Sequence, residues 1–159
     1  CETSGRNSGV LHAGFNNKAG SLMAKFCVEG NENFDEIAKE LDIPFKRTGK
    51  LVVGFNEEDK EKLIKMKEQG EANGVKGLEI INKDKIRKLS PYVEGNFALY
   101  SPQTGILNPF IYTIAMAENA VSNGVKYFLD NEVLDIKKVL EKDKDIFQIK
   151  TNKNICISI

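Results

Sequence analysis

A short polar segment near the start of the chain, residues 3–9, combines residue types that bind anions. It contains Thr3, Ser4, Gly5, Arg6, Asn7, Ser8 and Gly9. Glycine lets backbone N–H groups point at a ligand, hydroxyl side chains add further donors, and an arginine adds a bidentate phosphate donor. The segment therefore indicates an anion cradle. The alternative is a flexible, solvated tail without a ligand.

A second candidate is His12, the only histidine of the chain, which lies among apolar and small residues in the stretch 10–14. Beside a carbonyl, an imidazole acts as a base or a hydrogen-bond donor near neutral pH. The alternative is a structural histidine whose nitrogens are satisfied within the fold. A third candidate is the loop 104–109, which precedes a helix N-terminus, although capping by Asn108 explains it without a ligand.

Composition excludes several classes of function. The 159 residues carry 23 basic and 23 acidic side chains, so the net charge is zero and no basic field for nucleic acid exists. No apolar run approaches the roughly 20 residues of a membrane span. No basic region followed by an apolar one marks a signal peptide at the N-terminus. We expect a cytoplasmic protein without a nucleic-acid partner.

The cysteines argue against a metal site. Cys1, Cys27 and Cys156 have neither C-x-x-C spacing nor partner histidines, so we expect no zinc site. An odd number of cysteines in a chain of this size also argues against a disulfide framework. We expect reduced thiols.

These candidate residues must be positioned by a mixed set of elements, which predicts an α+β or α/β fold with a mixed or antiparallel sheet. Apolar residues at helical spacing predict a helix over 21–41, in which Gly30 permits close approach of another backbone or marks a break. Caps predict helices after Asn56, Asn82 and Asn108. Strands are expected over 48–55, 78–81, 97–100, 126–129, 132–139, 147–151 and 155–159, the last ones forming a small β-meander, and a brief strand is possible near 10–11.

Both ends of the chain suggest a piece of a longer protein. The first residue is Cys1, not an initiator Met, and the last five residues read as an alternating strand. We expect a truncated chain. The alternative is that this strand pairs with a hairpin partner and completes the fold.

Several stretches, taken together and in order, resemble one known family. They are TSGRNSGVLHAG at 3–14, GSL with AKFCVEG at 20–30, GKLVV at 49–53, NGV with GL at 73–78, and TGILNP at 104–109. The chain is similar, to about Val139, to the flavoprotein family of glycerol-3-phosphate dehydrogenase and L-2-hydroxyglutarate dehydrogenase (oxidase). The resemblance implies a fold like that of D-amino-acid oxidase.

This resemblance implies an FAD enzyme in which a C–H bond next to a hydroxyl is oxidised by hydride transfer to flavin. Electrons then pass to a quinone, another acceptor or oxygen. By resemblance, residues 3–9 lie along the FAD pyrophosphate and the flavin, and His12 lies close to the isoalloxazine ring. The small anionic hydroxy substrate is expected at Asn16, Asn17 and Lys50.

One departure affects the choice of substrate. After His12 the chain has Phe15-Asn16-Asn17, where relatives tend to have an Arg-Tyr or a Tyr-Tyr pair. The anion-binding side chain must then come from elsewhere. We favour glycerol-3-phosphate as the substrate, with 2-hydroxyglutarate as the alternative. An alternative of another class is a non-catalytic binding or interaction module on the same scaffold.

The resemblance also implies that the FAD-binding fold is incomplete here. The chain contains no G-x-G-x-x-G turn and no acidic ribose-binding residue following one. We expect residues 1–45 to belong to the FAD domain, 46–107 to the substrate domain, and 108–159 to an FAD-domain helix and β-meander. Alone, the chain is expected to be inactive and to hold little FAD. A homodimer through surface exposed by truncation is possible, and the parent enzyme is expected to be cytoplasmic or peripheral to a membrane.

Overall fold

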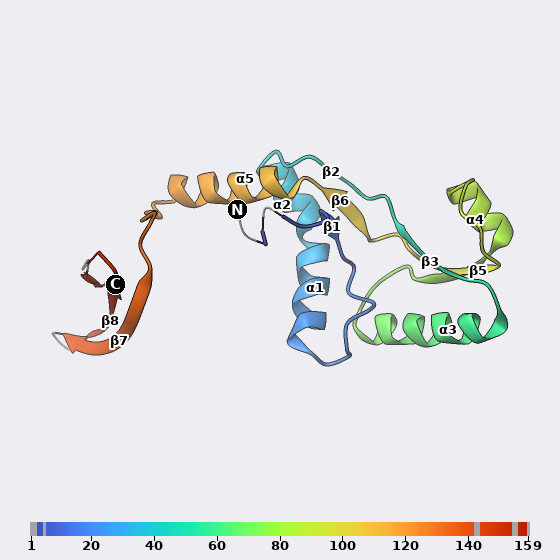
Figure 1. Ribbon diagram of the computed structural model, residues 1–159, viewed down its shortest axis with the longest axis horizontal. Helices are drawn as coiled ribbons and strands as arrows, with labels where there is room; N and C mark the ends of the chain where they lie inside the picture. Colours follow the sequence, from blue (N-terminus) through green and yellow to red (C-terminus); the bar gives the residue numbers. More distant parts are fainter. Residues whose placement is uncertain (1–2, 5, 142–143, 154–155, 159) are drawn as a thin grey trace. The chain divides into compact units, whose positions relative to one another are not determined.

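The computed structural model describes residues 3–4, 6–141, 144–153 and 156–158 of the chain. The fold is α+β, which was one of the two predicted classes, and its described strands form three small antiparallel sheets. The chain forms two compact units, residues 1–119 and 120–159. Figure 1 follows the elements in chain order.

The largest sheet of the first unit has the order β3-β5-β4, formed by β3 (Lys50–Gly54), β4 (Glu79–Asn82) and β5 (Phe97–Ser101). Helices α3 (Glu57–Ala72) and α4 (Lys83–Leu89) cover its opposite faces (Figure 1). The expected caps are confirmed. Asn56 accepts a hydrogen bond from the Asp59 N–H at 2.8 Å, and Asn82 accepts one from the Lys85 N–H at 3.1 Å.

Alternating side chains of β5 build two separate cores. Leu99 packs with Leu63 of α3, whereas Ala98 packs with Ile86 of α4. Neighbouring residues of a strand point to opposite faces, so one strand serves both cores. The core on the α3 side also contains Phe15 and therefore reaches the loop that follows His12.

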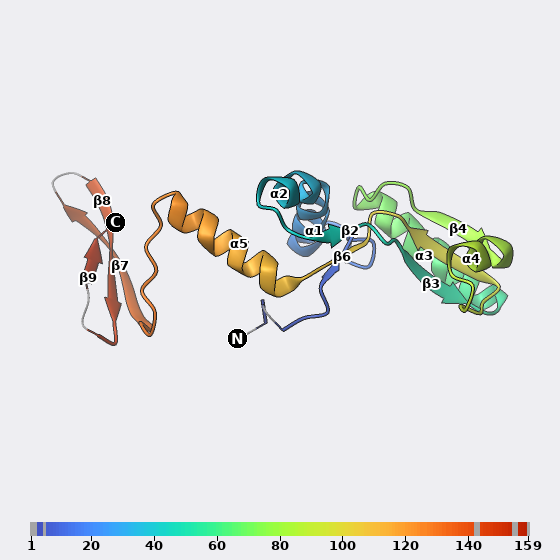
Figure 2. The same cartoon turned by 90° about the horizontal axis from the view of Figure 1, so that it is seen from above.

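A second sheet of the first unit has the order β1-β6-β2, and its strands are short: β1 (Val10–Leu11), β2 (Phe45–Lys46) and β6 (Gly105–Leu107). Figure 2 shows these strands beside α1 (Leu22–Glu32) and α2 (Phe34–Glu40). The ring of Phe34 packs edge-on against Phe45 at 5.1 Å and Tyr112 at 5.5 Å between centroids. Strand β6 lies within the stretch 104–109, which the sequence analysis describes as a loop. It is three residues long, too short to give a clear alternation.

The helix expected over 21–41 is two helices. The break lies at Asn33, which ends α1 and begins α2, and not at Gly30. Ser21 caps α1, because its hydroxyl accepts a hydrogen bond from the Ala24 N–H at 3.1 Å. Large apolar side chains of α1, namely Leu22, Met23 and Phe26, are exposed. The possible homodimer through such surface stays a prediction.

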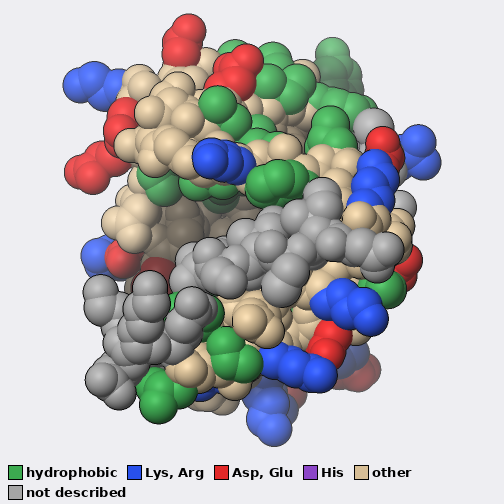
Figure 3. Space-filling view, turned by 90° about the vertical axis from the view of Figure 1, so that its left-hand side faces the viewer, with side chains coloured by type: hydrophobic (Ala, Val, Ile, Leu, Met, Phe, Trp, Pro, Cys, Tyr) green, Lys and Arg blue, Asp and Glu red, His purple; other side chains and the backbone are tan. Residues whose placement is uncertain are grey.

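The second unit contains the meander β7 (Val133–Glu141), β8 (Lys144–Thr151) and β9 (Cys156–Ser158). The strand expected over 126–129 is wrong, because those residues form no ladder and lead into a turn at 129–130. Apolar side chains of β7 and β8, including Ile136 and Phe147, are exposed. Figure 3 shows one face of the molecule, on which hydrophobic side chains lie at the surface among charged ones.

Helix α5 (Pro109–Ser122) begins in the first unit and ends in the second. Asn108 caps it by accepting a hydrogen bond from the Phe110 N–H at 3.0 Å, as predicted. Within the described part of the chain, no helix is both long enough and apolar enough to cross a membrane.

Candidate functional site

A pocket of about 360 Å³ forms where the chain leaves β1 and turns toward α1. Three of the residues that the sequence analysis selected, His12, Asn16 and Asn17, line this pocket together. The remaining lining residues are Ala13, Gly14, Phe15, Met23 and Cys27. Because His12 and Asn16 are exposed, a ligand can reach both from solvent. We call the segment 12–17 the pocket loop.

Side chains of α1 hold the backbone of the pocket loop at His12. The Asn31 amide nitrogen donates to the His12 carbonyl oxygen at 2.9 Å, and the Cys27 thiol donates to the same oxygen at 3.4 Å. Cys27 and Asn31 are four residues apart, so one face of the helix presents both donors. Two donors on one carbonyl fix the peptide plane that follows His12.

Side chains at the C-terminal end of α3 hold the rest of the pocket loop. The Asn73 amide nitrogen donates to the carbonyl oxygens of Gly14 at 3.0 Å and Asn17 at 2.8 Å. The Gln69 amide nitrogen donates to the Phe15 carbonyl oxygen at 3.1 Å. Two helices that are far apart in sequence therefore set the shape of the pocket loop.

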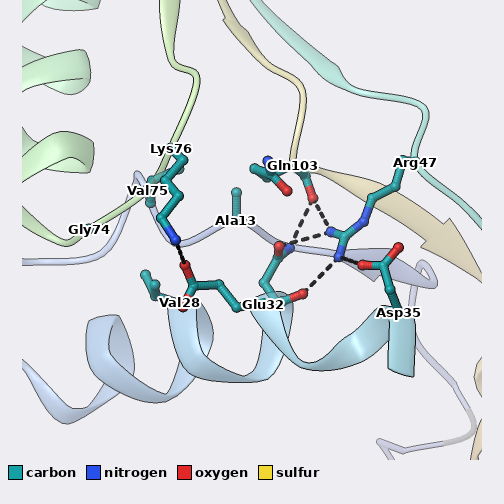
Figure 4. A pocket seen from close by; sticks show the side chains of 10 residues that line it. Ala13, Val28, Glu32, Asp35, Arg47, Gly74, Val75, Lys76 and Gln103 are labelled. Atoms are coloured by element: carbon teal, nitrogen blue, oxygen red, sulfur yellow. Dashed lines mark hydrogen bonds and ion pairs between the residues drawn. The ribbon is translucent and has the colours of Figure 1, made fainter. Parts of the chain in front are cut away.

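A second pocket, of about 380 Å³, contains a partly buried polar network (Figure 4). Asn31 is only 3% exposed, and its oxygen accepts a hydrogen bond from Arg47 Nη1 at 2.8 Å. Arg47 also donates to the Asn31 carbonyl oxygen at 2.8 Å, to the Gln103 carbonyl oxygen and to the Asp35 carboxylate. The Asn31 amide nitrogen reaches Gln103 as well, at 3.0 Å. The network is internally satisfied, as buried polar groups must be.

The remaining charges of this second pocket are also paired. Lys76 Nζ lies 2.7 Å from the Glu32 carboxylate, and this hydrogen bond raises the pKa of Lys76. Figure 4 shows this pair beside the Arg47 network. Because the chain itself neutralises these groups, the second pocket offers no unpaired charge to a ligand.

Lys50 lies near the pocket loop without lining its pocket. It is half-buried in β3, and its Nζ lies 5.5 Å from the centroid of the Phe15 ring. A cation over an aromatic face is held there by the ring quadrupole. The Phe15 ring thus connects Lys50 to the pocket, and its assignment to the substrate stays a prediction.

The described residues of 3–9, predicted to contact the cofactor, form a loop with hydrogen bonds between its own residues. The Asn7 amide nitrogen donates to the carbonyl oxygens of Thr3 and Ser4, both at 3.0 Å, and its oxygen accepts from the Gly9 N–H at 2.9 Å. Gly9 is buried, and its carbonyl oxygen accepts from the Leu107 N–H at 2.8 Å. Exposed side chains of the loop are Thr3, Ser4, Arg6, Asn7 and Ser8.

This loop and the pocket of residues 12–17 are not brought together into one cavity. No described residue of 3–9 lines that pocket. Gly5 lies outside the described residues. The donor set of the loop nonetheless suits a phosphate, because Arg6 forms no ion pair with any described residue and hydroxyls flank it. This chemistry fits the pyrophosphate end of FAD.

Burial decides the protonation of the thiol in the pocket. Burial raises the pKa of Cys27 above its ordinary value, and a hydrogen bond from the Asn17 side chain lowers it by a smaller amount. The thiol therefore keeps its proton at neutral pH and remains the donor to the His12 carbonyl. No group of three His, Cys, Asp or Glu side chains among the described residues is arranged to hold a metal ion.

Four residues that organise the pocket loop were not selected from the sequence: Asn31, Arg47, Gln69 and Asn73. The position of Asn31 in the sequence could have marked it as a structurally important residue. It lies seven residues after the buried Ala24, on the core-facing side of α1, where a polar side chain needs a partner. Arg47, Gln69 and Asn73 carry no such signal, because each partner lies at least 12 residues away in sequence.

Comparison with known families gives one match along most of the chain. The profile of the family DAO, described as FAD dependent oxidoreductase, matches residues 1–157. Glycerol 3-phosphate dehydrogenase of Caloramator mitchellensis is 45% identical over 155 residues, which is 96% of this chain and 31% of that protein. Mitochondrial L-2-hydroxyglutarate dehydrogenase of Nematostella vectensis is 38% identical over 141 residues, which is 89% of this chain and 31% of that protein.

Solved structures match in the same way. L-alpha-glycerophosphate oxidase of Mycoplasma pneumoniae, solved with FAD bound, has 27% identity and a TM-score of 0.78, over 95% of this chain and 40% of that one. Glycine oxidase of Geobacillus kaustophilus has 20% identity and a TM-score of 0.76, over 95% of this chain and 42% of that one, and shows the shared fold alone. The chain spans about a third of the length of the curated relatives that it matches.

Proposed function

Because the chain belongs to the family of FAD-dependent oxidoreductases, we propose that its parent enzyme oxidises the hydroxyl of a small anion, and that this anion is glycerol-3-phosphate. The observation that carries this proposal is the 45% identity to a glycerol 3-phosphate dehydrogenase over nearly the whole chain. The exposed imidazole and amide in one pocket support it, since oxidation of an alcohol needs a proton acceptor and an anion needs donors.

In this proposal His12 accepts the proton of the substrate hydroxyl. The O–H bond breaks toward an imidazole nitrogen while the neighbouring C–H bond gives up a hydride, which leaves a carbonyl. When bound, FAD supplies the acceptor of that hydride. His12 suits the role because it is exposed in the pocket and its backbone carbonyl is fixed by two donors.

Asn16 and Lys50 are the proposed contacts to the substrate anion. The Asn16 side chain is exposed and forms no hydrogen bond with any described residue, so its amide is open to a ligand. Lys50 brings a positive charge to the Phe15 side of the pocket. Asn17 is more constrained, because its amide donates to the Met23 carbonyl oxygen at 3.3 Å, and we assign it a positioning role beside the anion.

The exposed donors of residues 3–9 are the proposed contacts to the FAD pyrophosphate. Arg6 supplies a guanidinium, and Ser4 and Ser8 supply hydroxyls. The FAD-bound oxidase of similar structure supports this assignment at the level of the cofactor. We infer that the chain contributes contacts to FAD without holding it alone, because the phosphate-binding G-x-G-x-x-G turn is absent from its sequence.

The test is anaerobic reduction of the complete purified parent protein. We expect bound FAD, seen as yellow absorbance, and bleaching of that absorbance by glycerol-3-phosphate. His12→Gln should lower the rate of bleaching by about 10²–10⁴-fold while the FAD content stays unchanged, because a general base contributes about that much. A parent protein that neither contains nor takes up FAD would overturn the proposal.

The second candidate substrate is L-2-hydroxyglutarate, favoured by the 38% identity to dehydrogenases of that compound. Its two carboxylates differ from one phosphate in charge distribution, so the same assay separates the two substrates. We expect glycerol-3-phosphate to give the higher kcat/KM, and the reverse order would assign the parent enzyme to hydroxyglutarate. Lys50→Met should raise KM for the preferred anion and leave kcat within about twofold, because it removes binding alone.

A further inference from the structure

We infer that Asn31 and Arg47 are positioning residues for His12, forming a partly buried strut that fixes the backbone from which the imidazole extends. The catalytic part of this inference rests on the proposed function, and the structural part does not. The strut joins three segments: the pocket loop through His12, the loop between β5 and β6 through Gln103, and the segment after β2 through Arg47 itself.

The hydrogen bonds of Asn31 show how its side chain can fix the orientation of the His12 carbonyl group. Both protons of its amide nitrogen are used, on the His12 carbonyl at 2.9 Å and the Gln103 carbonyl at 3.0 Å. Its oxygen is used by Arg47 Nη1 at 2.8 Å. With all three ends engaged the amide cannot flip, so the His12 carbonyl has one orientation.

Arg47 holds the Asn31 side-chain amide in place through the amide oxygen. Its Nη2 donates to the Asn31 backbone carbonyl at 2.8 Å, so the guanidinium contacts both the side chain and the main chain of the same residue. The arginine side chain is 22% exposed, whereas its partner Asp35 is 56% exposed. A lysine keeps the charge but cannot form this planar fork.

The strut is separate from the contacts that hold the far end of the pocket loop. Gly14, Phe15 and Asn17 are held from α3 by Asn73 and Gln69. A defect in the strut should therefore move His12 and leave Asn16 in place. In kinetic terms, it should lower kcat and spare KM.

The structural test uses the fact that His12 is the only histidine of the chain. In the 159-residue chain labelled with ¹³C and ¹⁵N at histidine, the wild type should give one set of His12 ring and amide resonances. Arg47→Lys should split or broaden this set, and so should Asn31→Ser. The matched control, Asp35→Asn, removes the negative charge of the exposed partner of Arg47 and should leave a single set.

The catalytic test uses the complete parent protein with bound FAD. Arg47→Lys should lower kcat by about 10–100-fold with KM within twofold, because an ångström of misplacement costs up to about that much. Asp35→Asn should change kcat by less than threefold. If Arg47→Lys only lowers the urea midpoint while the His12 resonances stay single and kcat is kept, the strut is merely structural and the inference is wrong. If the wild type bleaches with neither substrate, the proposed function is wrong, and the resonance test still decides the strut.

Discussion

Residues 3–9 and the pocket loop 12–17 both contain Asn and Gly, yet their hydrogen bonds come from different places. In the first segment, Asn7 bonds to Thr3, Ser4 and Gly9, all within four residues. In the second, the donors from the two helices are Cys27, Asn31, Gln69 and Asn73, between 15 and 59 residues away. The bonds of Asn7 need only neighbouring residues, although Leu107 and Thr113 also donate to the carbonyl oxygens of Gly9 and Ser4. The pocket loop has its shape only when α1 and α3 are packed against it.

This difference indicates where substitutions will act. A change in residues 3–9 should stay local, because water replaces the lost hydrogen bonds of an exposed loop. A change in α1 or α3 should reach the pocket through the carbonyl groups that these helices hold. The predictions below test that contrast.

The largest effect on stability is expected at Gly70 of α3. A Cβ there would lie 2.4 Å from Leu78 Cδ1 and 2.7 Å from Phe15 Cβ. Gly70→Ala should therefore lower the free energy of unfolding by about 1–3 kcal/mol, the usual cost of overpacking a core. Urea unfolding followed by circular dichroism measures the change, since the chain has no tryptophan.

Gly30→Ala is the matched control, since Gly30 also lies inside a helix but a Cβ there meets nothing within 4 Å. This change should raise the free energy of unfolding by about 0.5–1 kcal/mol through helix propensity alone. Equal effects of the two substitutions would show that Phe15 does not pack against α3 as described.

A smaller contrast is expected between two asparagines. Asn73→Ala removes two hydrogen bonds to the pocket loop and should cost about 1–2 kcal/mol, since each contributes about 0.5–1.5 kcal/mol and the lost Asn73 Oδ1, buried without a partner among the described residues, offsets part of the cost. Asn7→Ala removes three bonds of an exposed loop and should cost less than about 0.5 kcal/mol. The same urea titration compares them, and a larger loss for Asn7→Ala would reverse the contrast.

The sequence predicts best what depends on neighbouring residues. The caps at Asn56, Asn82 and Asn108 follow from short-range chemistry, and each is present. The break at Asn33 was not predicted, because the apolar spacing continues through it. Phe34, the first residue of α2, packs against β2 and α5, which are contacts that local spacing does not reveal. Strand β6 was missed for a related reason: three residues become a strand only through their partners in β1 and β2.

In the candidate site, too, some residues could be predicted from the sequence and others could not. Residue type alone selected His12, the family resemblance added Asn16 and Asn17, and these residues line one pocket. It did not select Asn31 and Arg47, because their role arises from contacts between segments separated by up to 72 residues. Residues that a ligand would touch can be found from a motif, whereas the residues that hold them depend on the folded arrangement.

The smallest expected effect concerns the reactivity of a thiol in α1 beside the pocket loop, compared with a thiol placed in residues 3–9. In a Cys1→Ser, Cys156→Ser background, Cys27 should react with iodoacetamide a few-fold more slowly at neutral pH than the same chain in urea, because burial raises its pKa and less thiolate is present. Moving the thiol to the exposed loop, by Cys27→Ser with Ser8→Cys, should abolish the difference between native and unfolded chains.

The raised pKa also fixes the sign of a pH effect on stability. Below the ordinary thiol pKa both states hold the proton, and the contribution of Cys27 is fully present. As the pH rises from the unfolded pKa toward the higher folded one, the unfolded chain binds fewer protons than the native chain, so the free energy of unfolding falls. Cys27→Ser should remove this part of the decline. A decline of the same size in the variant would show that the thiol is not shielded by α1 and the pocket loop, and the contrast between the two loops would then fail at Cys27.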